Sequence, residues 1–118
     1  MSDKKDFGID GLLALSGDRY FIDDTGDLEV IFNISRIAVS PARPHGLKYS
    51  LVLLNSKGDR LVCFDNAHAL SQRSGSGKRI AKVFDHKHIG NKVVAYIYKD
   101  AYTLVADFWS EVDKLVLK

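Results

Sequence analysis

The sequence predicts an α+β fold, a mainly antiparallel sheet of about five strands with one C-terminal helix packed on one face. Three observations predict it. Apolar residues alternate with polar ones along several short segments, which is typical of strands with one buried face. Turn residues separate these segments at hairpin spacing. In the last segment the apolar residues recur every three or four positions, which is typical of an amphipathic helix.

The N-terminal half predicts one hairpin and a long strand. Residues 19–22 form a short apolar segment, and the Asp- and Gly-rich residues 23–27 follow as a turn. Residues 28–35 alternate between apolar and polar side chains, and we expect Pro41 and Pro44 to end this strand, because proline cannot donate to a ladder. Residues 1–16 are less defined, since residues 12–15 fit either a short helix or an added strand.

The C-terminal half predicts a second hairpin, a further strand and the helix. Residues 48–54 and 60–65 should pair through the turn at residues 55–59, and residues 92–99 form another strand. Asp100 can cap the closing helix. Trp109 belongs to the helix's apolar stripe and is interpreted as a core residue. The stripe consists of Leu104, Val105, Phe108, Trp109, Val112, Leu115 and Val116.

Composition indicates one ordinary domain that spans residues 1–118. The chain has 46% hydrophobic and 27% charged residues, enough for a single core, and it contains no repeat or linker. No apolar run reaches the roughly 18 residues that a membrane span needs, and the charged start does not fit a secretory signal. We therefore expect a cytoplasmic protein without membrane contact. Cys63, the only cysteine, cannot form an internal disulfide and is interpreted as a small buried hydrophobe.

Charge is unevenly distributed. Residues 1–30 carry eight acids and three bases, net −5, whereas residues 31–118 carry fourteen bases and seven acids, net +7. A low-hydrophobicity stretch at residues 71–82 predicts a flexible basic loop. Such clusters can hold a phosphate backbone, although many are only solvated. The GSGK sequence at 75–78 lacks the first glycine and the final Ser or Thr of a nucleotide-binding loop. The predicted nucleic-acid-binding residues are Lys48, Arg73, Lys78, Arg79, Lys82 and Lys87.

The histidines point to a site. All four lie between residues 45 and 88, and His86 and His88, two apart, should point the same way just before the strand at 92–99. Cleavage of RNA without a metal needs a base, an acid and a cation, and histidine suits the proton steps. The predicted catalytic residues are His86, His88, Tyr49 and Asp65. Asp65 and Asn66 also fit a structural role, because Asx side chains satisfy turn amides at strand ends.

A metal site is the competing chemistry. Asp85, His86 and His88, with Asp65 or His68 from the neighbouring strand end, offer carboxylate and imidazole ligands. The spacing is loose and matches no established metal motif, so metal-free chemistry without a cofactor is favoured. The nearby His45 is as compatible with an exposed, idle side chain as with a functional one.

Several segments in order resemble the TumE-like family of prokaryotic toxins. They are Lys48-Tyr49 on a strand, Phe64-Asp65-Asn66 at a strand end, the pair His86 and His88, and Asp107-Phe108 in the closing helix. Residues 68–83 look like an insertion relative to that pattern. The resemblance implies a growth-inhibiting toxin of a type II toxin-antitoxin system, neutralised by a helix-turn-helix antitoxin. It implies no settled reaction.

Different function classes therefore remain open. The first is an endoribonuclease-like toxin that uses the basic loop and the histidines. The second is a non-catalytic module that binds nucleic acid or protein through the same basic surface, and the third is a metal-dependent hydrolase. RNA is one possible partner, and homo-oligomerisation stays open. Fold alone cannot choose among these functions.

Overall fold

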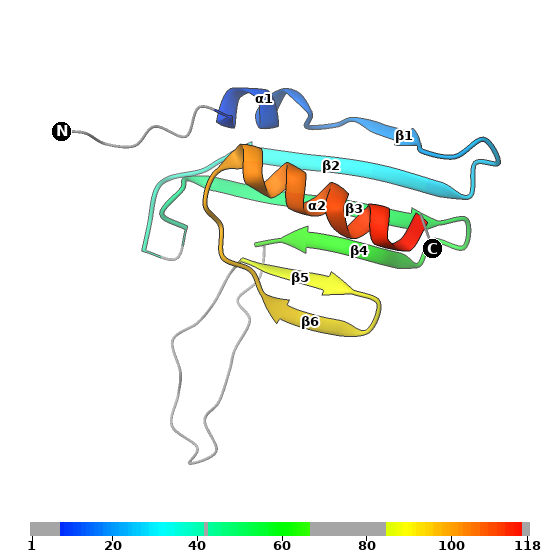
Figure 1. Ribbon diagram of the computed structural model, residues 1–118. Helices are drawn as coiled ribbons and strands as arrows, with labels where there is room; N and C mark the ends of the chain where they lie inside the picture. Colours follow the sequence, from blue (N-terminus) through cyan, green and yellow to red (C-terminus); the bar gives the residue numbers. More distant parts are fainter. Residues whose placement is uncertain (1–7, 42, 67–84, 117–118) are drawn as a thin grey trace, which may run out of the picture.

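The computed structural model describes residues 8–41, 43–66 and 85–116. Six strands form one sheet in the order β1-β2-β3-β4-β5-β6, and every neighbouring pair is antiparallel. The helix α2 lies across one face of this sheet (Figure 1). The strands are β1 (Arg19–Phe21), β2 (Leu28–Arg36), β3 (Leu47–Asn55), β4 (Arg60–Asp65), β5 (His86–Ile89) and β6 (Lys92–Ala95), and the helices are α1 (Ile9–Ala14) and α2 (Ala101–Val116). The predicted α+β class is confirmed.

Both predicted hairpins form, and their turns use local side-chain bonds. Asp23 accepts hydrogen bonds from the amides of Asp27 and Leu28 at 3.3 and 3.1 Å, which closes the β1–β2 turn. In the β3–β4 turn, Asn55 accepts from the amides of Lys57 and Asp59 at 2.9 and 3.0 Å. These are the Asx bonds that favour such turns.

The core lies between the sheet and α2. Alternate residues of β2, β3 and β4 point to this face, and α2 covers them with the larger part of its apolar stripe, as the period-two and helical patterns predict. The last two residues of the predicted stripe, Leu115 and Val116, are instead exposed at the end of the helix. Aromatic rings join the two layers: Phe108 of α2 lies 5.6 Å from Phe32 of β2 and 5.9 Å from Phe64 of β4 between ring centroids. Trp109 packs against this core, as predicted.

The main difference from the prediction is an additional strand. His86 and His88 do not precede a strand but lie on a strand of their own, β5, which turns at Gly90 (φ 60°) into β6. The strand predicted at 92–99 is also shorter and ends at Ala95. The partner strand β5 begins at His86, and the last backbone hydrogen bond between the two segments runs from the Tyr96 amide to the Asp85 carbonyl at 2.9 Å. Beyond Tyr96 the chain has no strand to pair with on that side among the described residues.

Two further boundaries differ from or refine the expectation. The strand β2 ends at Arg36, before Pro41, so the prolines do not end it. Residues 9–14 form a short helix, which settles the alternative for the N-terminal segment. The predicted cap of α2 is present, because Asp100 accepts a hydrogen bond from the Thr103 amide at 2.7 Å.

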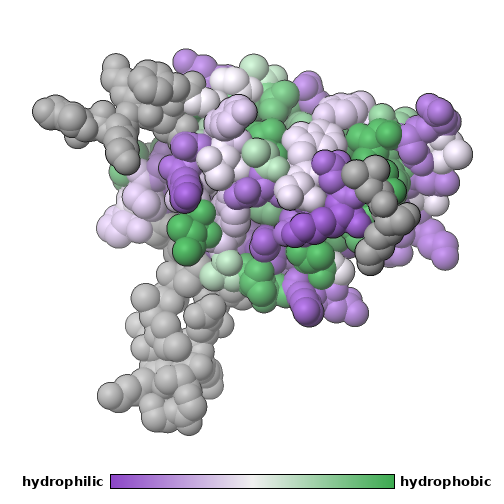
Figure 2. All heavy atoms as spheres, viewed as in Figure 1, coloured by the Kyte–Doolittle hydropathy of each residue, from purple (hydrophilic) through white to green (hydrophobic). Residues whose placement is uncertain are grey.

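The surface seen in Figure 2 is the side that carries α2. Purple hydrophilic residues run between several separate green patches there (Figure 2). Among the residues described, neither helix combines the length and the apolar character needed to cross a bilayer.

Candidate functional site

The sheet separates the predicted site residues onto two faces. Side chains alternate along a strand, so the residues between those that pack under α2 point to the opposite face, here called the back face. Four predicted residues lie on the back face: Lys48, Asp65, His86 and His88. Tyr49 and Lys87 instead lie on the α2 side, where Tyr49 is a core residue and Lys87 contacts α2.

Asp65, His86 and His88 form one back-face cluster. His86 pairs directly with Asp65 across β4 and β5, and His88 pairs with Cys63, two residues from Asp65. His86 Nε2 lies 3.1 Å from Asp65 Oδ1, and His88 Nε2 lies 4.0 Å from Asp65 Oδ2. The two imidazole rings meet edge to face with centroids 4.9 Å apart. The prediction that the two histidines point the same way is confirmed.

One oxygen of this cluster lacks a hydrogen bond. Within the described chain, Asp65 Oδ1 is buried and accepts none, because the nearby His86 ring stands within contact distance but outside hydrogen-bond geometry. A buried acceptor left in this state costs on the order of 1–3 kcal/mol. The oxygen is therefore available to a proton, an ion or a bound molecule.

Burial sets the protonation states around Asp65. Burial, with the charge of His86 second, lowers the pKa of His88 below its ordinary value, so its imidazole is neutral at pH 7. Burial and the Asp65 carboxylate raise the pKa of Cys63 to about 12. The thiol therefore keeps its proton and donates to Asp65 Oδ2 at 3.3 Å, which fits the expected unreactive, buried cysteine.

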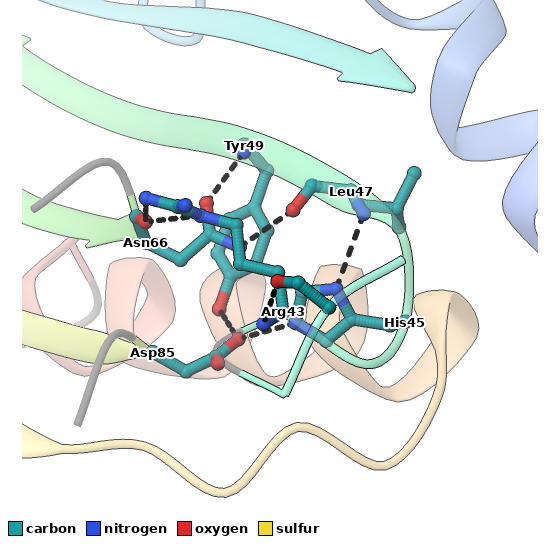
Figure 3. A network of polar contacts seen from close by, with 7 residues as sticks. Arg43, His45, Leu47, Tyr49, Asn66 and Asp85 are labelled. Atoms are coloured by element: carbon teal, nitrogen blue, oxygen red, sulfur yellow. Dashed lines mark hydrogen bonds and ion pairs between the residues drawn. The ribbon is translucent and has the colours of Figure 1, made fainter. Parts of the chain in front are cut away.

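A second polar network lies on the α2 side of the sheet and is drawn in Figure 3. The Tyr49 hydroxyl donates to Asp85 Oδ2 at 2.7 Å, and His45 Nε2 lies 3.0 Å from the same oxygen. The other ring nitrogen of His45 accepts from the Leu47 amide at 3.3 Å. His45 is therefore not the exposed side chain that the sequence allowed. Its side chain is only 8% exposed, and each of its two ring nitrogens has a hydrogen-bond or ion-pair partner.

The same network fixes the end of β4 to β3. Asn66 accepts from the Tyr49 amide at 2.9 Å and donates to the Leu47 carbonyl at 2.7 Å. The Arg43 guanidinium donates twice to the Asn66 carbonyl, at 3.1 and 2.9 Å. Asn66 therefore has the expected structural role. Since its bonds in this network are to backbone groups and Asp85 already bonds to Tyr49 and His45, we interpret the network as structural.

The predicted nucleic-acid-binding residues are only partly described. Lys48 is exposed on the back face. Lys87 makes an ion pair with Glu111 of α2 at 3.0 Å and lies 5.8 Å above the Phe64 ring, so its charge is directed toward the helix. The remaining four lie outside the described residues, as do His68 and the predicted loop at 71–82: Arg73, Lys78, Arg79 and Lys82.

One neighbour of the cluster was not predicted. Arg60 Nη1 lies 3.8 Å from Cys63 Sγ, and its charge contributes to lowering the pKa of His88. The register shifts between Leu53 and Leu54, so that Arg60 pairs with Leu54. A β-bulge of this kind turns a side chain that simple alternation would place on the other face. No sequence signal marked it.

The cluster can transfer protons or bind a cation. A neutral imidazole that is partly exposed, a second imidazole held beside a carboxylate and a nearby guanidinium are groups that phosphodiester cleavage uses. Two imidazoles and a carboxylate are also a common donor set for divalent transition metals.

The comparisons identify a family. The family model described as Toxin TumE matches residues 13–116 and so includes the whole back-face cluster. No curated protein and no solved structure matches the chain. The resemblance deduced from the sequence is confirmed and extends farther toward the N-terminus.

Proposed function

Because this chain belongs to the TumE toxin family, we propose that it is the toxin half of a type II toxin-antitoxin pair and stops growth in the cytoplasm by cleaving RNA. Membership of this family identifies the chain as a toxin, for which an antitoxin is the expected partner. We propose a helix-turn-helix protein as that antitoxin.

One observation carries the RNA-cleaving activity. Two neighbouring strands bring Asp65, His86 and His88 together on the back face, although the carboxylate and the imidazoles are 21 and 23 positions apart in the chain. Side chains on paired strands are held more firmly than those on loops. A partly exposed, neutral His88 beside a buried carboxylate is the arrangement that a general base needs.

The reaction supported by these groups is transesterification of RNA. The ribose 2′-oxygen attacks phosphorus and gives its proton to one imidazole, the bond from phosphorus to the 5′-oxygen breaks, and that oxygen takes a proton from the other histidine in its protonated form. Arg60 and the exposed Lys48 can neutralise the phosphate. The products end in a 2′,3′-cyclic phosphate and a 5′-hydroxyl.

The test compares His88→Ala with Val93→Ala. Val93 pairs with His88, points to the same face and is 43% exposed. Its substitution by Ala therefore shortens a neighbouring side chain that carries no titratable group. We expect induced His88→Ala to permit growth and its purified form to cleave RNA roughly 10²- to 10⁴-fold more slowly. Val93→Ala should stay toxic.

Two results would contradict the proposal in different ways. Full toxicity of His88→Ala at equal soluble expression would show that the active site does not lie in the back-face cluster. A toxic wild-type protein that leaves RNA intact would favour the alternative, a non-catalytic module that acts by binding through its basic segment.

A further inference from the structure

The back-face cluster presents three donor atoms around one point. One ligand atom from each of Asp65, His86 and His88 lies within 4.8 Å of the other two. Ligands bound to a single zinc ion at about 2.0–2.2 Å lie roughly 3–3.5 Å from one another. His86 Nε2 already has this spacing from Asp65 Oδ1, at 3.1 Å, and His88 Nε2 lies 4.0 Å from the other oxygen, Oδ2. The widest spacing among the three donors, up to 4.8 Å, must therefore close by roughly an ångström when an ion binds. His88 is the most exposed of the three, at 24%.

A second observation points to a ligand at the same place. Asp65 Oδ1 is buried without a hydrogen bond in the described chain, and it faces His86 Nε2. A carboxylate with an unused oxygen beside two imidazoles is incomplete as a hydrogen-bonded network. The same carboxylate and imidazoles can together supply one side of a metal coordination sphere.

We propose that Asp65, His86 and His88 bind one divalent transition-metal ion of the zinc, manganese or iron class. Two imidazoles and a carboxylate on one side of the ion leave coordination positions open for water or a phosphate oxygen. The ligands come from two paired strands, so their spacing is held by the sheet ladder rather than by a loop.

The structure also changes which residues a metal would use. Asp85, the carboxylate that the sequence suggested first, lies in the other network, bonded to Tyr49 and His45. Asp65 takes its place. Cys63 Sγ lies 3.3 Å from Asp65 Oδ2 but is not among the three donors that converge.

This inference goes beyond the proposed function and does not rest on it. An ion can bind whether or not RNA is cleaved. Were the ion bound during RNA cleavage, His86 and His88 would hold it and could not also carry protons, so the proton-transfer role given to them above would fall to another group; the ion would supply further positive charge for the phosphate.

The experiment uses the untagged full chain, stripped with a chelator and titrated with Zn²⁺ by calorimetry and with Co²⁺ by visible absorption. We expect one ion per chain, cobalt d–d bands and a higher unfolding temperature with Zn²⁺. His88→Gln and Asp65→Asn should each weaken binding at least roughly 10- to 100-fold. Cys63→Ser and Val93→Ala, which change the neighbours of the ligands, should bind as the wild type does.

Thermal unfolding without metal checks that each variant is folded, and His88→Gln, at the most exposed position of the three, is the variant that should fold most easily. A folded wild-type protein that binds no ion would reject the site, as would unchanged binding in both ligand variants. If ion binding fails while His88-dependent RNA cleavage persists, the metal site is wrong and the proposed function stands. If the ion binds and RNA stays intact, the metal site stands and the proposed RNA cleavage is wrong.

Discussion

At the scale of single residues, the direction of a side chain decides its role. Tyr49 and Lys48 are neighbours in the chain, yet one is a core residue under α2 and the other is exposed on the back face. The same alternation separates Lys87 from His86 and His88. A site predicted as one group of adjacent residues is thus divided by the sheet, and Asp65 with the two histidines is the part that stays together.

Tyr49→Phe tests this division. Its hydroxyl donates to the carboxylate of Asp85 in a buried network, so its removal should lower the free energy of unfolding by about 1.5–3 kcal/mol. Toxicity and RNA cleavage should persist, because burial and Asp85 raise the pKa of Tyr49 well above its usual value and the side chain is on the α2 side. Urea unfolding and the growth assay measure the two effects. Tyr102→Phe, at a 77% exposed position, is the control. Loss of toxicity in a folded Tyr49→Phe would restore its predicted catalytic role.

At the scale of elements, α2 is joined to the strand that carries the histidines. Lys87 of β5 contacts Glu111 of α2 at 3.0 Å, and Lys114 approaches the same carboxylate at 3.5 Å. Burial alone would raise the pKa of Glu111, but the hydrogen bonds and charges of Lys87 and Lys114 together outweigh it, so the pKa lies below its ordinary value. The ion pair therefore helps to place β5 against the helix.

Glu111→Gln should destabilise the protein in a pH-dependent way. A carboxyl whose pKa is lowered on folding contributes stability above its unfolded pKa, near 4.3, and loses it as the pH falls through the folded value. We expect a loss of about 1 kcal/mol at pH 7, since the pair is only partly buried, and almost no difference from wild type once the pH is below the lowered pKa of the folded state. Denaturant unfolding at several pH values measures it. Asp113→Asn, an exposed change on the same helix, should show no such trend, and a pH-independent loss in Glu111→Gln would exclude the ion pair as its cause.

The elements were predictable where their patterns are long. The nine residues of β2 and the sixteen of α2 repeat their period often enough to be distinguished. The strand β5 has four residues, two of them histidines, and shows no clear alternation. The bulge that turns Arg60 toward Cys63 depends on register, and His45 meets Asp85 across 40 positions of chain. Such long-range pairings follow from the packing of the whole sheet, which local patterns do not contain.

At the scale of the whole molecule, charge is unevenly distributed along the chain. The first 30 residues are net negative and the rest are net positive, with six bases against one acid between Arg73 and Lys92. The family implies a neutralising antitoxin. Since complementary charge speeds encounter and fixes register, we place an acidic antitoxin segment against this basic stretch.

Co-expression with the protein encoded by the neighbouring gene tests this placement. We expect a complex whose affinity falls as salt rises, because added ions screen exposed charges. Replacing Lys78 and Arg79 with Glu should lower the association rate at least about tenfold at low salt, whereas the same replacement of Lys57 and Lys99, an equal change of charge outside the stretch, should have little effect. Stopped-flow association at low and high salt gives both rates. The placement would be wrong if the complex were tight and its affinity did not change with salt, while Lys78 and Arg79 remained accessible to lysine- and arginine-modifying reagents. The antitoxin would then bind elsewhere, and the back face with its cluster of Asp65, His86 and His88 would be the next surface to test by the same two measurements.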